Sequence, residues 1–121
     1  MILLDTNALI WIDRGHPRAT ALRRSAALYV SPATVLELQV LAEAGRIRLR
    51  SGSVRSVLDD DRWIIDDPPA IEWFERSCDL SWARDPFDRL IVAHALLRRW
   101  RIATADGSIL DRLGPAACVE L

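Results

Sequence analysis

The chain has 121 residues, of which 50% are hydrophobic, and its 16 basic and 17 acidic residues leave a formal net charge of −1. This length predicts one compact domain, residues 1–121, with a single core. The near-neutral charge excludes a broadly basic nucleic-acid-binding surface, so any such binding must be local. All 16 basic residues are arginines, which excludes mechanisms that need a catalytic or phosphate-binding lysine.

No apolar run approaches the roughly 20 residues that span a bilayer, and the start of the chain has no basic, cleavable leader. We therefore expect a cytoplasmic protein with no membrane contact. Cys78 and Cys118 have no metal-ligand spacing, which argues against a zinc site or a disulfide framework.

Short apolar runs alternate with helical patterns along the chain. The sequence predicts, in order, a strand at 2–4, helices at 7–12 and 18–26, a strand at 28–30 and a helix at 32–44. The stretch 46–57 is ambiguous and fits a short strand followed by a helix. After it we expect a central strand at 63–65, helices at 68–78 and 86–99, a strand at 102–104, a helix at 108–113 and a last strand at 117–119.

Two helix starts are especially clear. Ser31-Pro32 and Asp85-Pro86 each pair a capping side chain with a proline, which is preorganised for the first helical position. Asp88 then occupies the third position of its helix, as in a capping box.

Alternating strands and helices predict an α/β fold, specifically a three-layer α/β/α sandwich with a central parallel sheet. Ligands of such sheets bind beyond the carboxyl ends of the strands. Asp5 follows the first strand and Asp106 follows the strand at 102–104, so both are expected at this edge.

Each candidate carboxylate also has a purely structural explanation. Asp5 and Asp106 could serve only as helix N-caps. Glu37 lies in a largely apolar helix, so it must be exposed, paired with an arginine or near a cation. Asp85 and Asp88 share one helical face, and we assign the cap to Asp85 and the site to Asp88.

Four carboxylates that converge on one crevice would repel each other strongly. Two unit charges about 4 Å apart cost about 4 kcal/mol at an effective dielectric of about 20. Oxygen ligands without histidine or thiolate favour a hard divalent cation such as Mg²⁺.

Four stretches of the chain together resemble the PIN-domain ribonucleases, and within them the VapC-type toxins of type II toxin-antitoxin pairs. The stretches are Met1–Trp11, Val30–Leu38, Asp85–Ala95 and Thr104–Asp106.

The resemblance implies an acidic quartet of Asp5, Glu37, Asp88 and Asp106, with Asp85 as an additional acid of the subgroup. It also implies endonucleolytic cleavage of RNA with Mg²⁺ or Mn²⁺, a small DNA-binding antitoxin as partner, and a homodimer. The subgroup often has histidine where this chain has Ala83, so one supporting side chain is missing.

We expect three of the acids to hold the metal and Glu37 to orient metal-bound water or a second ion. Four residues are candidates to support them through hydrogen bonds, with ordinary turn and cap bonds as the alternative. Arg84 and Arg89 are candidates to hold RNA phosphate, with exposed or salt-bridged arginine as the alternative. The metal set is Asp5, Asp88 and Asp106, and the supporting set is Thr6, Asn7, Thr104 and Asp85.

Other function classes fit less well. A haloacid dehalogenase phosphatase needs a second aspartate where this chain has Asn7, and it needs a lysine. Receiver domains and P-loop NTPases fail for the same lysine. A catalytically silent PIN scaffold that binds RNA or protein stays open as the alternative.

Overall fold

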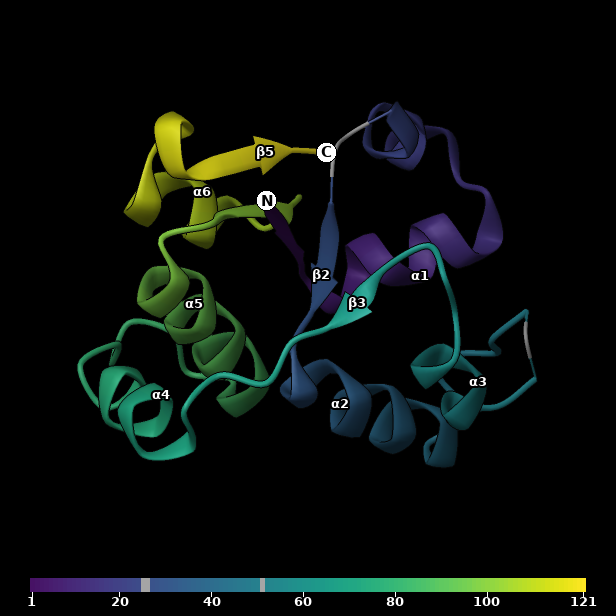
Figure 1. Cartoon of the computed structure of the whole chain (residues 1–121), viewed down its shortest axis with the longest axis horizontal. Coiled ribbons are helices and arrows are strands. Elements are labelled where there is room, and N and C mark those ends of the chain that lie inside the picture. Colours follow the sequence, from purple (N-terminus) through teal and green to yellow (C-terminus); the bar gives the residue numbers. More distant parts are fainter. Residues whose placement is uncertain (25–26, 51) are drawn as a thin grey trace.

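A computed structural model describes residues 1–24, 27–50 and 52–121. Among these residues, five parallel strands form one sheet in the order β3-β2-β1-β4-β5 (Figure 1). The chain order reverses at β1, which pairs with β2 on one side and β4 on the other. The strands are β1 (Ile2–Leu4), β2 (Leu28–Val30), β3 (Ile64–Ile65), β4 (Arg101–Thr104) and β5 (Cys118–Glu120).

Helices cover both faces of this sheet. In Figure 1, α4 and α5 pack side by side on one face, while α1 and the 3₁₀ helix η1 lie on the other. The expected three-layer α/β/α architecture is therefore confirmed. The helices are α1 (Thr6–Arg14), η1 (Pro17–Arg24), α2 (Pro32–Glu43), α3 (Val54–Leu58), α4 (Ala70–Ser77), α5 (Pro86–Arg98), α6 (Gly107–Leu113) and η2 (Pro115–Ala117).

The middle strand of the sheet, β1, is apolar throughout because it is covered on both faces. Leu3 of β1 packs in the cluster that includes Ile91 of α5, whereas its neighbour Leu4 packs in the cluster that includes Leu9 of α1. Successive strand residues point to opposite faces, so one short strand contributes to both halves of the core.

The two clear helix starts are confirmed. Ser31 caps α2, where its hydroxyl accepts a hydrogen bond from the Ala33 N–H at 3.2 Å. Asp85 caps α5 through bonds from the N–H groups of Phe87 and Asp88 at 2.9 and 3.0 Å.

Two expectations about the elements were wrong. The strand expected at 63–65 is not central: β3 pairs only with β2 and forms an edge of the sheet. The helix expected at 18–26 is the 3₁₀ helix 17–24, whose buried Ala19 and Leu22 are three residues apart, matching three residues per turn. Residues 25–26, which the expected helix included, lie outside the described part of the chain.

The ambiguous stretch 46–57 forms a helix only from Val54 onward, and its described residues before that helix contain no strand. Ile47 and Leu49 still contact the core, so their alternation with arginines reflects burial rather than pairing in the sheet. Among the described helices, none is both long enough and apolar enough to cross a membrane.

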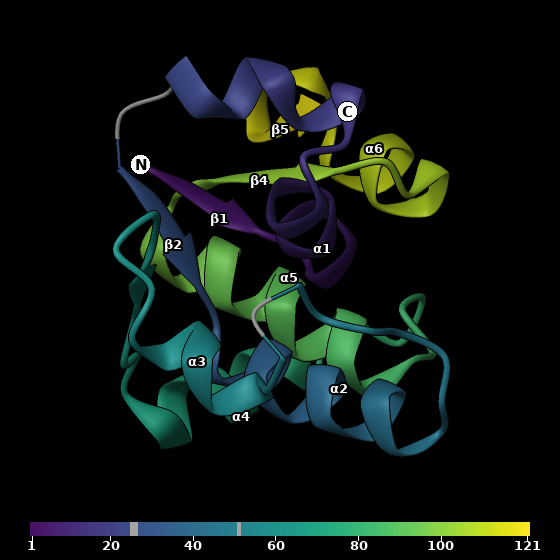
Figure 2. The ribbon, with the colours of Figure 1, turned by 90° about the vertical axis from the view of Figure 1, so that its right-hand side faces the viewer.

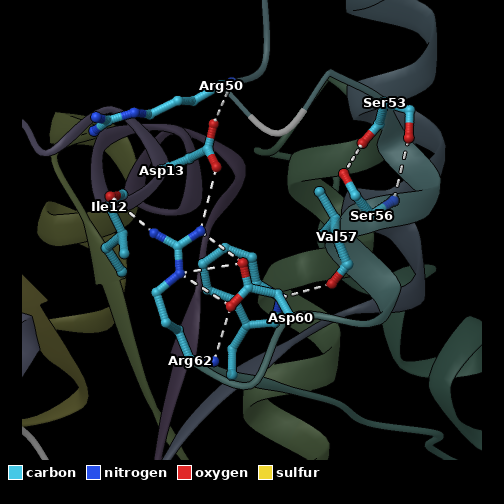
Figure 3. A network of polar contacts seen from close by, with 9 residues as sticks. Ile12, Asp13, Arg50, Ser53, Ser56, Val57, Asp60 and Arg62 are labelled. Carbon is cyan, nitrogen blue, oxygen red and sulfur yellow. Dashed lines mark hydrogen bonds and ion pairs between the residues drawn. The ribbon is translucent and has the colours of Figure 1, made fainter.

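The buried carboxylate of Asp13 fixes the loops at Arg50 and Arg62 to α1 (Figure 3). Asp13 is only 4% exposed and lies in the last turn of α1, where the helix dipole disfavours a negative charge. Its carboxylate accepts hydrogen bonds from the Arg50 N–H at 2.8 Å and from the Arg62 guanidinium at 3.3 Å. Arg62 also pairs with Asp60 at 2.6 Å. Asp13 therefore joins α1 to two separate loops.

We predict that Asp13→Ala lowers the free energy of unfolding by about 2 kcal/mol, because the Arg50 N–H loses its partner and Arg62 loses one of two carboxylates. Urea denaturation measures this change. Asp61→Ala, at an exposed position, is the matched control and should change stability by less than about 0.5 kcal/mol. Equal effects of the two substitutions would contradict the role assigned to Asp13.

Candidate metal-binding and catalytic site

Two aspartates lie where β1 and β4 end. Asp5 directly follows β1, and its N–H donates to the Ala103 carbonyl of β4 at 3.1 Å. Asp106 lies two residues beyond the end of β4. Because the two strands are parallel neighbours, both aspartates lie at the carboxyl edge of the sheet, next to the point where the strand order reverses.

Both aspartates also cap helices. The Asp5 Oδ1 accepts a bond from the Ala8 N–H at 2.7 Å at the start of α1. The Asp106 Oδ1 accepts bonds from the N–H groups of Ser108 and Ile109 at 2.8 and 3.2 Å at the start of α6. The caps engage Oδ1 in each case, so capping does not exclude a second role for either carboxylate.

Helices α2 and α5 bring three more acids to this edge. The two helices contact each other, and Figure 2 shows them below the strands, with the arrowhead of β1 pointing to the start of α1. Glu37 of α2, Asp88 of α5 and the α5 cap Asp85 each have one carboxylate oxygen within 4.8 Å of the other two. This is close enough for one small cation to contact all three groups.

The crowding of negative charge changes the protonation of these groups. Burial, as the largest cause, and the charges of Asp85, Glu37, Asp106 and Asp5 together raise the pKa of Asp88 from 3.8 to about 7. The five acids therefore interact electrostatically as one group, although they come from separate parts of the chain. Without a cation, Asp88 is partly protonated near neutral pH.

The pKa values of Glu37 and Asp5 are also raised. Burial raises the pKa of Glu37, and the charges of Asp85 and Asp5 add to this effect, while a hydrogen bond from Thr6 opposes it. Burial also raises the pKa of Asp5, with Asp106 adding to the increase and a hydrogen bond from Thr104 opposing it.

Buried threonines orient the acids. The Thr6 hydroxyl donates a short hydrogen bond to Glu37 Oε1, and it also lies 3.3 Å from the Thr34 hydroxyl. The Thr104 hydroxyl oxygen accepts the Asp106 N–H at 3.0 Å, which leaves its proton for Asp5. Asn7 is exposed and its described contact with Asp5 is through the backbone N–H.

Thr34 was missed by the sequence analysis. It is fully buried and lies three residues before Glu37, on the same face of α2. That spacing was the available signal, but only the packing of α1 against α2 brings Thr34 to Thr6.

The two arginines next to the acidic helix start border a cavity of about 290 Å³, which Phe74 and Leu90 also line. Arg84 is exposed, and the Arg89 Nε donates to the Ala83 carbonyl at 2.8 Å. None of the ion pairs found within residues 1–24, 27–50 and 52–121 involves either arginine. Their guanidinium groups therefore remain available to an anion.

The structure thus places all the proposed acids at one edge, but it groups them unevenly. The closest three are Glu37, Asp85 and Asp88, whereas the expected metal set was Asp5, Asp88 and Asp106. The two sets share Asp88, whose pKa is raised by the charges of all four other acids. Asp85, expected mainly as a cap, is both a cap and a member of the closest group.

A family model described as "PIN domain" matches residues 2–114. The chain belongs to the PIN domain family. A comparison with curated proteins found no match.

Solved structures agree with this PIN assignment at the level of the fold. A toxin-antitoxin complex from Klebsiella pneumoniae is 24% identical with a TM-score of 0.69, covering 100% of both chains. VapBC2 from Rickettsia felis, bound to a DNA fragment from its promoter, is 20% identical with a TM-score of 0.69, covering 100% of this chain and 99% of that chain. FitAcB from Neisseria gonorrhoeae is 24% identical with a TM-score of 0.59, covering 99% of this chain and 97% of that chain.

One position of this PIN domain departs from the expected subgroup pattern. Ala83 replaces the frequent histidine and is buried, with 7% of its surface exposed. Its carbonyl holds Arg89, a contact that does not depend on the side chain at this position.

We predict that Asp88→Asn stabilises the metal-free PIN domain clearly more at pH 8 than at pH 5. Because the folded pKa of Asp88 is raised from 3.8 to about 7, its contribution to stability is lost as pH rises between these values. Urea denaturation with a chelator at both pH values measures the difference, with Asp111→Asn on the exposed face of α6 as control. A gain that is equal at pH 5 and pH 8 would show that Asp88 does not titrate as described.

Proposed function

We propose that this chain acts as a single-domain, metal-dependent endoribonuclease, the toxin of a VapBC-type toxin-antitoxin pair. The observation that carries the proposal is the electrostatic coupling of Asp88 to the four other acids at the carboxyl edge of a PIN-family sheet. Capping alone would not require Asp88, a half-buried carboxylate among four like charges, because α1, α5 and α6 already have their capping aspartates, Asp5, Asp85 and Asp106.

The donor set fits Mg²⁺ or Mn²⁺. All candidate ligands are carboxylate oxygens, and one of them, Asp88, has oxygens of Glu37 and Asp85 within 4.8 Å, a density of carboxylates that suits a small, hard cation. Asp5, Asp88 and Asp106 would hold the ion, directly or through water. When bound, the ion lowers the pKa of a coordinated water and stabilises negative charge on a phosphodiester oxygen.

Side chains next to these three acids would orient the water and support the metal ligands. Glu37, which accepts a hydrogen bond from Thr6, would direct the attacking water and accept its proton, because its raised pKa makes it a stronger base than an ordinary glutamate. Thr104 joins the Asp106 backbone to the Asp5 carboxylate and fixes the spacing of two ligands. Asn7 and Asp85 support the site through the α1 start and the α5 cap.

Arg84 and Arg89 are proposed to hold RNA phosphate beside the acids. They flank Asp85 and Asp88 in sequence, and Arg89 is held in position by the Ala83 carbonyl. Two guanidinium groups here would offset the negative potential that the acids present to RNA.

The proposed partners are an RNA substrate, a cognate antitoxin protein and a second copy of this chain. Two of the similar solved structures are named as a toxin-antitoxin complex and as VapBC2, which supports the antitoxin. The proposed location of the protein is the cytoplasm, where it would meet its RNA substrate.

The proposal predicts cleavage of structured RNA that needs Mg²⁺ or Mn²⁺ and stops when a chelator is added. Asp88→Asn and Asp5→Asn should each lower kcat/KM at least about 100-fold, since each removes a ligand whose cation contributes several kcal/mol. Asp111→Asn is the matched control and should cleave like the parent chain.

Gel analysis of end-labelled RNA measures these rates. Cleavage that survives both site substitutions would overturn the proposed site. RNA binding without cleavage in the parent chain would instead support the silent PIN scaffold.

A further inference from the structure

Residues Arg46–Arg50, which follow α2, form a segment with arginines on one side and apolar residues on the other. The three arginines, Arg46, Arg48 and Arg50, are exposed, whereas Leu49 is buried and Ile47 packs against the same core cluster. We call residues 46–50 the arginine segment. Its alternation directs three guanidinium groups to solvent from one short stretch of backbone.

Hydrogen bonds fix the arginine segment at both ends and in the middle. The Arg46 N–H donates to the Leu41 carbonyl at 2.9 Å, and the Arg50 N–H donates to buried Asp13 at 2.8 Å. Figure 3 shows the Arg50 side chain extending away from that carboxylate. The Arg14 guanidinium adds a bond to the Arg48 carbonyl at 3.4 Å. The segment is therefore a positioned surface, although it is neither helix nor strand.

The stretch of chain that contains the segment carries only positive charge, between Glu43 and Asp59. Residues 44–58 contain four arginines, the three of the segment and Arg55, and no acidic residue. Within the described chain, no ion pair involves any of these four side chains. Unpaired guanidinium groups are strong donors to phosphate oxygens.

A hollow of about 570 Å³ lies beside the segment, lined by Arg48 together with Gln39 of α2 and Ser53 at the start of α3. The helix α2 connects this hollow directly to the acidic site, because it carries Glu37 and ends just before the segment. Arg48, Gln39 and Ser53 thus supply the polar part of a lining that is otherwise apolar, next to the helix that supplies the candidate general base.

We propose that the arginine segment binds the phosphate backbone of the RNA substrate outside the acidic site. A cluster of five acids repels a polyanion, so a protein with this net charge needs a separate cationic surface to hold RNA. Arginine fits phosphate with paired N–H donors, and a row of three binds successive phosphates without reading sequence. The choice of RNA as the polyanion rests on the proposed function.

The test compares two charge-matched double variants, Arg46→Gln/Arg48→Gln in the segment and Arg76→Gln/Arg99→Gln on the α4–α5 side. Arg76 and Arg99 are exposed, lie outside the ion pairs of the described residues, and belong to α4 and to the C-cap of α5. Both pairs are combined with Asp88→Asn so that the RNA is bound and not cut. Fluorescence anisotropy with a labelled single-stranded RNA of about 20 nucleotides, from about 50 to 200 mM NaCl, gives the affinity and its salt dependence.

The segment variant should bind RNA about tenfold more weakly at low salt, and its slope of log K against log salt should be shallower by about 1.4, the value for two lost phosphate contacts. The control variant should match the parent. Equal losses in the two variants, no loss in either, or a loss seen with duplex DNA and not with RNA would overturn the proposal.

A kinetic arm separates this inference from the proposed nuclease activity. In the chain with Asp88 intact, the segment variant should raise KM for RNA with little change in kcat, because it removes binding remote from the reacting phosphate. If the parent does not cleave RNA at all, the nuclease proposal fails while the binding comparison still decides the role of the segment.

Discussion

Repulsion among carboxylates is the constraint on which the site depends. Five acids meet at the carboxyl edge of the sheet, and the charges of the other four help to raise the pKa of Asp88 to about 7. An unfolded chain would separate these groups, so the fold must hold them together against their own electrostatics. The α5 N-terminus reduces part of this cost, since its dipole favours negative charge at Asp85 and Asp88. A bound divalent cation would offset much more.

Hydrogen bonds and ion pairs elsewhere oppose this repulsion by fixing the elements that carry the acids. His94 of α5 is fully buried, and its Nε2 lies 2.7 Å from Asp66, which follows β3. Arg98, one turn further along α5, donates to the same carboxylate at 2.8 Å. These contacts tie the helix that carries Asp88 to the edge of the sheet. Asp13 does the same for α1, which begins at Asp5, through Arg62 and the Arg50 backbone.

Much of this arrangement was predictable because local rules and long-range packing agree. The apolar run Ile2–Leu4 forms a buried strand, and Ser31 and Asp85 cap helices as their proline neighbours indicate. The parallel sheet then brings Asp5 and Asp106 to one edge.

Features that depend on contacts between distant segments were not predictable. The peripheral place of β3 depends on which strand pairs with it, and a two-residue apolar stretch does not encode that choice. The approach of Thr34 to Thr6 depends on how α1 packs against α2. The membership of Asp85 in the closest group of acids was not predicted, because capping alone accounts for an aspartate at the start of α5. The arginine segment resembled a strand in the sequence because apolar residues and arginines alternate along it. In the structure the apolar residues pack against the core, but the segment pairs with no strand.

The central claim is that these acids share a cation, and locating Mn²⁺ in crystals by anomalous scattering tests it most directly. The account predicts a peak within bonding distance of Asp88 and of at least one of Asp5 and Asp106. A peak only elsewhere on the molecule, or no peak at these acids under saturating Mn²⁺, would contradict it.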